Sequence, residues 1–312
     1  MLSAHRRTRG MRAIRPGFSL VELLIVIVIL AVVLTSVMTI FVQQQRFYSD
    51  SSAIIETRSS TRDAAYVLQS DFRSLSPKSG DIYAMGPSFV EFRSQLGSTV
   101  VCSIDPARTT ITVPPLNVAT GAALTSWLTP PANGDTVLIF APGSTSAAVS
   151  DTFYTYALTA LPTGAASCPN ATNLTTTAGE ATQGFTFKVT PPLSAGTIVG
   201  APIRIMRRAR YELYQAASGN WYLGYFDCVP LRVPVCNALQ PIAGPYVAPN
   251  LAGTGGIAFT YRDSLGVVTA DPKLVRRVDL AARAQTSVSV HTSGYTRGPL
   301  TDSTFVSIAP RN

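Results

Sequence analysis

The sequence predicts an α+β fold, in which a long N-terminal helix, transmembrane in its first half and amphipathic in its second, packs on a mainly antiparallel β-sheet domain. The helix is predicted because no Gly or Pro occurs from Phe18 through Ser76. The sheet is predicted because short apolar or alternating runs, separated by turn residues, follow Pro77. We expect a basic leader at 1–17, a membrane half at 18–42, an exported amphipathic half at 43–76 and an exported β-rich domain at 77–312.

The basic leader accounts for most of the net charge of +8. Its removal would leave 20 basic against 17 acidic residues, a balance that carries no strong indication about partners and leaves nucleic acid possible but unsupported. Lys and Arg beside a membrane segment stay on the cytoplasmic side, so we expect everything after the segment to lie outside. The five leader arginines are Arg6, Arg7, Arg9, Arg12 and Arg15.

The membrane half is an apolar run of 25 residues, 18–42, that contains one charge, Glu22. At about 1.5 Å per residue it is ~37 Å long, enough to cross a hydrocarbon core of ~30 Å. A secretory signal peptide has a shorter apolar stretch followed by small residues at its cleavage site, and neither feature occurs here. We therefore expect one membrane-spanning helix.

The amphipathic half continues the same helix. Apolar residues recur at spacings of mostly three, four or seven, which places them on one helix face. Pro77 disfavours helical geometry at Ser76, so we expect one helix over residues 18–75 whose second half packs along the exported domain. The predicted face consists of Phe47, Ile54, Ala65, Leu68, Phe72 and Leu75.

Glu22 is the unusual residue of the membrane half. An acidic side chain inside a membrane helix costs about 2.5–3.5 kcal/mol on insertion scales and is normally retained for a partner. The alternative is that Glu22 lies close enough to the cytoplasmic end to reach headgroups and water. The residues alone leave both interpretations open.

The run Gly17-Phe18-Ser19-Leu20-Val21-Glu22, between a basic leader and an unbroken apolar stretch, resembles the processing signature of type IV prepilins and type II secretion pseudopilins. The resemblance implies cleavage after Gly17 by a prepilin peptidase and N-methylation of Phe18. It also implies that Glu22 pairs with the N-terminal amine of a neighbouring subunit. The implied partners are other pilins, the peptidase and the inner membrane, with the mature form in the periplasm or a surface pilus.

Two departures from the family pattern refine this expectation. Pro16 stands where Lys or Arg is common, and Thr39 stands where major pilins often carry a proline. The second departure favours a minor pilin or a pseudopilin over the bulk subunit. Residues 43–76 are similar to the helix of PilW-type minor pilins, and the pseudopilin GspJ has a comparable late helix. We expect a minor pilin of a priming or tip complex, with a type II secretion pseudopilin as the alternative and a DNA-binding or adhesive uptake pilin as a further one.

The exported domain reads as strands and loops. Expected strands are Ser88–Arg93, Thr99–Ile104, Thr109–Val113, Thr136–Phe140, Phe153–Leu158, Phe185–Val189, Ile203–Tyr214, Asn220–Phe226, Leu274–Ala282 and Thr304–Ile308. Residues 216–220 are the expected turn of a β-hairpin. Expected loops are Thr120–Gly134, Leu161–Gly184 and Pro241–Gly256.

Four cysteines lie in the exported part, where disulfides persist. Three pairings are open: Cys228 and Cys236 are the natural local pair, which would leave Cys102 to pair with Cys168. A four-thiolate zinc site usually needs two closely spaced pairs, so disulfides are favoured. We expect no metal and no cofactor.

Enzyme chemistry has little support in the sequence. The mature chain would retain one histidine, His291, near Ser287 and Ser289, and nucleophile activation needs a base that a third group orients. No phosphate-binding Gly loop and no His/Glu pair at metal-ligand spacing occurs. We expect no enzyme.

A candidate basic patch, Arg204, Arg208 and Arg210, lies with Met206 on one face of an expected strand, with Arg207 on the other. One interpretation is that the patch contacts DNA or a neighbouring subunit. The other, which we favour, is that it is a solvated face or a charged edge that blocks strand pairing. Nearby aromatic side chains would form an adhesive surface or, as we favour, pack in the core. These are Tyr211, Tyr214, Trp221, Tyr222, Tyr225 and Phe226.

Overall fold

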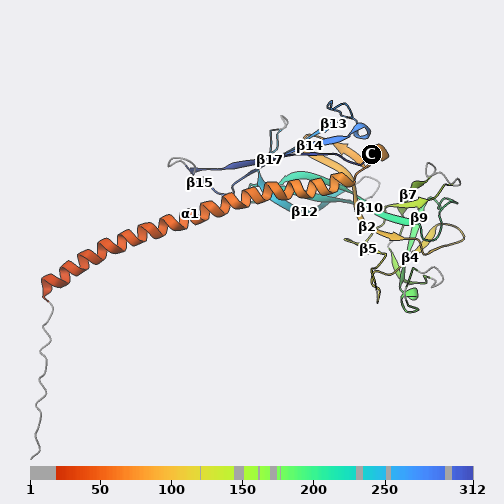
Figure 1. The fold of residues 1–312 in the computed structure, drawn as a ribbon, viewed down its shortest axis with the longest axis horizontal. Coiled ribbons are helices and arrows are strands. Elements are labelled where there is room, and N and C mark those ends of the chain that lie inside the picture. The colour runs from red at the N-terminus through yellow and green to blue at the C-terminus, as the bar shows by residue number, and fades with distance from the viewer. Residues whose placement is uncertain are drawn as a thin grey trace, which may run out of the picture. The chain divides into compact units, whose positions relative to one another are not determined.

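The computed structural model consists of one long helix and an antiparallel β-sheet domain, with 25% helix and 41% strand (Figure 1). The chain divides into two compact units, Met1–Ala53 and Ile54–Asn312, and each is described by itself. The structure describes residues 19–119, 121–143, 151–160, 162–168, 174–175, 177–229, 235–250, 254–291 and 297–311.

Helix α1, Leu20–Ser74, is a single element of 55 residues. The predicted helix is confirmed over these residues, and the absence of Gly and Pro explains why it is not broken. The short 3₁₀-helix η1, Pro77–Ser79, follows at once. Gly80, at φ 81°, then accepts a left-handed conformation that favours glycine and turns the chain into the sheet.

Within the described residues every strand pair is antiparallel, and fifteen strands form one branched sheet. Its main path runs β13-β14-β12-β11-β10-β6-β7-β9-β4-β3; β2 also pairs with β10, β1 and β5 pair with β2, β8 with β9 and β17 with β14, while β15 and β16 pair with each other. Two further 3₁₀-helices are η4, Glu180–Thr182, and η5, Pro272–Leu274. The strands are β1 (Ile82–Met85), β2 (Phe89–Val100), β3 (Ser103–Ile104), β4 (Thr110–Val113), β5 (Ser126–Trp127), β6 (Thr136–Ala141), β7 (Thr152–Leu158), β8 (Thr163–Ala166), β9 (Gly184–Thr190), β10 (Pro202–Gln215), β11 (Trp221–Val229), β12 (Val235–Tyr246), β13 (Ile257–Arg262), β14 (Arg277–Gln285), β15 (Val290–His291), β16 (Arg297–Gly298) and β17 (Thr301–Ile308).

Strands β2 and β10 are long enough to serve two separate hydrophobic cores. On β10, Ile203 and Ile205 belong to a core shared with β4, β6, β7 and β9, whereas Tyr211 and Leu213 belong to a core shared with the end of α1. The pairing of β10 with β2 shifts register between Ile205 and Met206, where one core gives way to the other. The β domain therefore has a helix-side core and a distal core.

The helix face that packs on the sheet is partly polar. Leu68 and Phe72 are buried as predicted, and the Phe72 ring lies 5.9 Å from that of Phe92. Earlier in the helix, small residues at the same spacing are buried instead: Thr57, Ser60, Thr61 and Ala64. Thr57, Ser60 and Thr61 were missed because the predicted face followed apolar residues alone.

Phe47 corrects the predicted amphipathic face, because its side chain is 74% exposed within its own unit. The buried face is anchored instead by hydrogen bonds to β12. The Ser60 hydroxyl donates to the Gly244 carbonyl oxygen at 2.8 Å, and the Tyr246 hydroxyl donates to the Ser60 carbonyl oxygen at 2.7 Å. A small side chain at position 60 therefore permits this polar contact between helix and sheet.

Most expected strands are present, and the predicted hairpin is confirmed by β10 and β11, whose turn is closed by a hydrogen bond from Ala216 N–H to the Asn220 carbonyl at 2.9 Å. The prediction was wrong about Pro241–Gly256, because β12 continues to Tyr246. Register shifts in the pairing of β11 with β12 accommodate the proline and glycine residues that suggested a loop. Strands β1, β5, β8, β12, β13 and β16 were missed, residues 101–102 separate β2 from β3, and Leu274 lies in η5.

Candidate functional site

The N-terminal turn of α1 holds Glu22. Ser19 precedes the helix as its cap: the Val21 N–H donates to Ser19 Oγ at 3.3 Å, and the Leu23 N–H donates to the Ser19 carbonyl oxygen at 3.1 Å. Glu22 stands three residues after Ser19, the spacing of a capping box, and a carboxylate in the first turn is favoured by the helix dipole. This Ser-x-x-Glu signal was present in the sequence and was missed.

Gly17 and Phe18, the predicted cleavage and methylation positions, lie outside the described residues. Over residues 20–42 every described side chain is exposed within this chain, and Glu22 is the one charged residue among them. No cation among the described residues lies within ion-pair distance of Glu22. The carboxylate is therefore presented on an apolar surface that the described part of the chain leaves uncovered.

Helix α1 is long and apolar enough to cross a membrane, with a mean hydropathy of 3.1 in its most apolar window, and it is the one described helix that passes this test. The apolar surface of its first half has the length that a hydrocarbon core requires. The chain is thus anchored as a single-pass membrane protein.

The candidate basic patch is locally neutralised. The guanidinium groups of Arg208 and Arg210 form ion pairs with Glu91 and Glu212, the second at 2.9 Å. Arg204 lies over the ring of Phe153, 5.0 Å from its centroid. Two of the three arginines are therefore paired with acidic side chains. This pairing neutralises most of the positive charge that a phosphate-contacting surface on this strand would need.

Arg207 lies on the opposite face of β10, as its position in the strand predicts. Its partner is Asp135, which the sequence analysis did not name as a site residue. Its Nε donates to Asp135 Oδ1 at 2.9 Å and its Nη2 donates to Asp135 Oδ2 at 2.8 Å, with both side chains buried. The hydrogen bonds that Arg207 donates to this carboxylate raise the pKa of Arg207 above its ordinary value. The buried pair lies between the helix-side core and the distal core.

The aromatic side chains of the β10–β11 hairpin contribute mainly to packing. Tyr211 stacks on Phe92 at 5.3 Å and meets Tyr225 edge-on at 5.3 Å, and Tyr214 lies 6.1 Å from Tyr222. Trp221 is packed against the helix-side core.

The four cysteines form the two disulfides that the sequence analysis favoured, Cys102 with Cys168 and Cys228 with Cys236. Glu91 lies close to the second pair, with 3.6 Å between Cys236 Sγ and Glu91 Oε1. Since both sulfurs of that pair are bonded to each other, they offer no thiolate to a metal ion.

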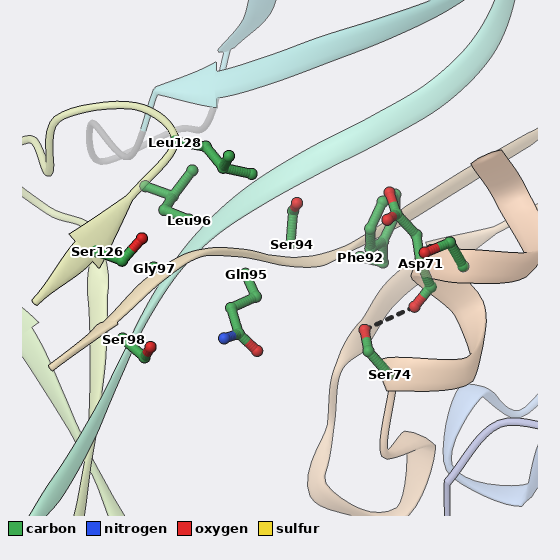
Figure 2. A pocket seen from close by; sticks show the side chains of 11 residues that line it. Asp71, Ser74, Phe92, Ser94, Gln95, Leu96, Gly97, Ser98, Ser126 and Leu128 are labelled. Carbon is green, nitrogen blue, oxygen red and sulfur yellow. Dashed lines mark hydrogen bonds between the residues drawn. The ribbon is translucent and has the colours of Figure 1, made fainter. Parts of the chain in front are cut away.

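A polar hollow of about 310 Å³ lies between the last turns of α1 and strand β2 (Figure 2). The Ser74 hydroxyl donates to the Asp71 carbonyl oxygen at 2.7 Å, as Figure 2 shows, and the Tyr211 hydroxyl donates to Asp71 Oδ2 at 2.8 Å. Burial raises the pKa of Asp71, against the lowering effect of the Tyr211 hydrogen bond. The other lining residues are Ser70, Phe92, Ser94, Gln95, Leu96, Gly97, Ser98, Ser126 and Leu128.

Neither this hollow nor the expected histidine offers an assembled catalytic group. The lining of the hollow contains no histidine, cysteine or lysine. His291 lies in β15, and Ser287, Ser289 and His291 are all exposed on the described surface.

Comparison with known families identifies one match. Residues 14–38 match the family model described as the prokaryotic N-terminal methylation motif. The match contains Gly17, Phe18 and Glu22. No curated protein and no solved structure matches this chain.

Proposed function

We propose that this chain, which carries the N-terminal methylation motif of a type IV prepilin-like protein, is a minor pilin that helps to prime or cap a type IV pilus. The observation that carries the proposal is the coincidence of the motif with one continuous helix that exposes its apolar first half and Glu22. A type II secretion pseudopilin would share both features and remains the alternative. The chain is proposed to be a structural subunit and not an enzyme.

In the proposed maturation, a prepilin peptidase on the cytoplasmic face cleaves after Gly17 and the new Phe18 amine is methylated. Cleavage removes the arginine-rich leader and creates an ammonium group at the edge of the apolar surface. That group and the Glu22 carboxylate would each be costly in lipid, and they neutralise one another when a neighbouring subunit docks in register. The neighbour supplies the cation that Glu22 lacks within the described chain.

The basic leader places the N-terminus on the cytoplasmic side of the inner membrane, with the β domain in the periplasm and later in the pilus. The partners in this proposal are other pilins, through the first half of α1, and the peptidase. We do not assign nucleic acid as a partner, because Arg208 and Arg210 are paired with acidic side chains.

Mass spectrometry of the mature N-terminus tests the proposal directly. Membranes and sheared surface filaments are compared in cells with and without prepilin peptidase. A methylated Phe18 that depends on the peptidase and occurs in filaments is the expected result. An intact leader in both strains would refute the proposal, and processed chain that is needed for secretion but absent from pili would assign it to type II secretion.

The role of Glu22 is tested by Glu22→Gln, with Glu56→Gln as the matched control on an exposed position of the same helix. Glu22→Gln is expected to insert and to be processed, because it removes a charge from the membrane segment, but to be lost from filaments by about tenfold or more. Glu56→Gln is expected to enter filaments normally. Normal filament entry of Glu22→Gln would show that the carboxylate does not set the register.

A further inference from the structure

Strand β17 is an edge strand of the sheet. It pairs with β14 over eight residues in uninterrupted antiparallel register, from Gln285 opposite Thr301 to Val278 opposite Ile308. No other strand in the described part of the chain pairs with it. Its second edge therefore presents main-chain groups that no strand in the described part of the chain uses.

The register identifies the outward-facing groups. The Thr286 N–H donates to the Leu300 carbonyl at 2.9 Å, so by the alternation of an antiparallel ladder the even-numbered residues of β17 bond to β14. The odd-numbered residues then direct their N–H and C=O groups away from the sheet. Of these, the Ser303 N–H is taken by Asp302 Oδ1 at 2.9 Å, whereas Phe305 and Ser307 have no described partner for their main chain.

The second half of this edge lacks the usual protection against strand pairing. Natural edges are blunted by charged side chains, Pro, bulges or a covering segment. The one charged residue of β17 is Asp302, which pairs with Arg58 of α1 at 3.8 Å, whereas residues 304–308 contain no charged residue and no Pro, and the pairing with β14 contains no bulge. By contrast, the outer edge of β13 is covered, because the Phe259 N–H donates to the Pro87 carbonyl at 2.8 Å and the Thr269 N–H donates to the Tyr261 carbonyl at 3.0 Å.

A hollow of about 470 Å³ lies on the solvent-facing side of β13, β14 and β17. Ala258, Ala281 and Phe305 contribute its apolar surface, and the Phe305 side chain is 68% exposed. Side chains of an added strand would alternate between the two faces of the sheet. Every second one would therefore lie on the face that carries the hollow, where an apolar side chain would cover Phe305.

The unpaired main-chain groups of the β17 edge can pair with another extended strand. The geometry disfavours a second copy of this chain as the source of that strand. A two-fold axis that pairs two β17 edges antiparallel reverses every direction in the plane of the sheet. The Ile54 ends of the two helices, from which each chain leads to its membrane segment, would then lie at opposite ends of the pair. We propose that the β17 edge binds a β-strand of a different exported polypeptide, with an apolar side chain placed over Phe305.

The test uses the full chain in detergent micelles and, as the probe, a fluorescent heptapeptide of alternating valine and threonine, an extended strand whose sequence does not occur in this chain. Ser307→Pro removes one outward N–H, and Ser307→Ala is its matched control. Both variants lose the Ser307 hydroxyl bond to Asp279 Oδ1, but only the proline variant loses the N–H. Thermal unfolding of each variant verifies the fold.

We expect saturable peptide binding that Ser307→Ala changes by less than about twofold and that Ser307→Pro weakens by at least about fivefold, the effect of one lost main-chain hydrogen bond. Absence of binding, or equal binding by the two variants, would overturn the inference. Dimerisation of the full chain that Ser307→Pro abolishes, measured by analytical ultracentrifugation, would identify the occupant as a second copy and would also overturn it.

In cells, a photoreactive residue at Thr301 is expected to form an adduct with a chain of another mass, present with Ser307→Ala and absent with Ser307→Pro. An adduct of twice the mass of this chain, or one that does not distinguish the two variants, would contradict the proposal. The inference relies on the proposed function only for the compartment of the partner. If the β17 edge binds the probe but the N-terminus is never processed at Phe18, this inference holds and the pilin proposal is refuted.

Discussion

Phe72→Ala is the perturbation that most directly tests how the helix holds the β domain. Phe72 is 1% exposed, and its ring lies 5.9 Å from that of Phe92, 6.4 Å from that of Tyr211 and 5.8 Å from that of Phe259. Truncating a buried phenylalanine in such a cluster costs about 3–5 kcal/mol of the free energy of unfolding. At about 2–4 °C per kcal/mol for a domain of this size, the midpoint should fall by roughly 6–20 °C.

The assay is denaturant unfolding of the full chain in micelles, with Trp127→Phe in every variant so that the fluorescence comes from Trp221, which packs against the same core. Tyr66→Ala is the control on the same helix, since Tyr66 is 77% exposed, and should change the free energy of unfolding by less than about 0.5 kcal/mol. A Phe72→Ala cost below about 1 kcal/mol, or an equal cost for Tyr66→Ala, would refute the assigned packing face.

Three further changes probe the β domain. Burial raises the pKa of Asp71, so ionisation of its carboxyl group lowers the stability of the folded state as pH rises above the ordinary pKa of 3.8. In thermal melts, Asp71→Asn should therefore become progressively more stable than the wild type from about pH 4 upward. Asp135→Ala removes the carboxylate that accepts both close hydrogen bonds from the buried Arg207 and leaves Asp227, at 3.9 Å, as its acidic partner, so it should cost up to about 3–5 kcal/mol in denaturant unfolding, while adding Arg207→Met should restore most of the loss. Removing the disulfide that closes 66 residues, with Cys102→Ser and Cys168→Ser, should cost about 4 kcal/mol by loop entropy in the same assay.

Each of these expectations can fail in its own way. A constant difference between Asp71→Asn and wild type from pH 3 to pH 8 would show that the carboxylate does not titrate as a buried group. If the double variant Asp135→Ala, Arg207→Met has the same free energy of unfolding as Asp135→Ala, the cost of Asp135→Ala does not come from the charge left on the buried arginine. The other disulfide closes a separation of 8 residues, and its loss should cost about 2.5 kcal/mol, so a larger loss there would contradict the loop-entropy argument.

The local signals in the sequence identified the features that depend on neighbouring residues. An uninterrupted run without Gly or Pro predicted α1, and Pro77 predicted its end. Period-two runs and a Gly-containing turn predicted β10, β11 and their hairpin. The methylation motif was recognised from six consecutive residues and their flanks, because processing enzymes act on a linear segment.

Tertiary structure decided the features that depend on which distant segments meet. Arg208 pairs with Glu91 across 117 positions, and Arg207 pairs with Asp135 across 72, so the order of strands determines which charges are neutralised. Ser60 is buried because it faces Gly244, although nothing in its own surroundings in the sequence is apolar enough to predict burial.

The open edge of β17 is likewise a property of the whole sheet, because a strand is an edge only when every other strand has been placed. The sequence by itself determined the anchor, the processing signal and the local strands, since these follow from periodicity and composition within a few residues. Only the fold decided which side chains and main-chain groups remain free for a partner, since burial and pairing are set by contacts between residues far apart in the chain.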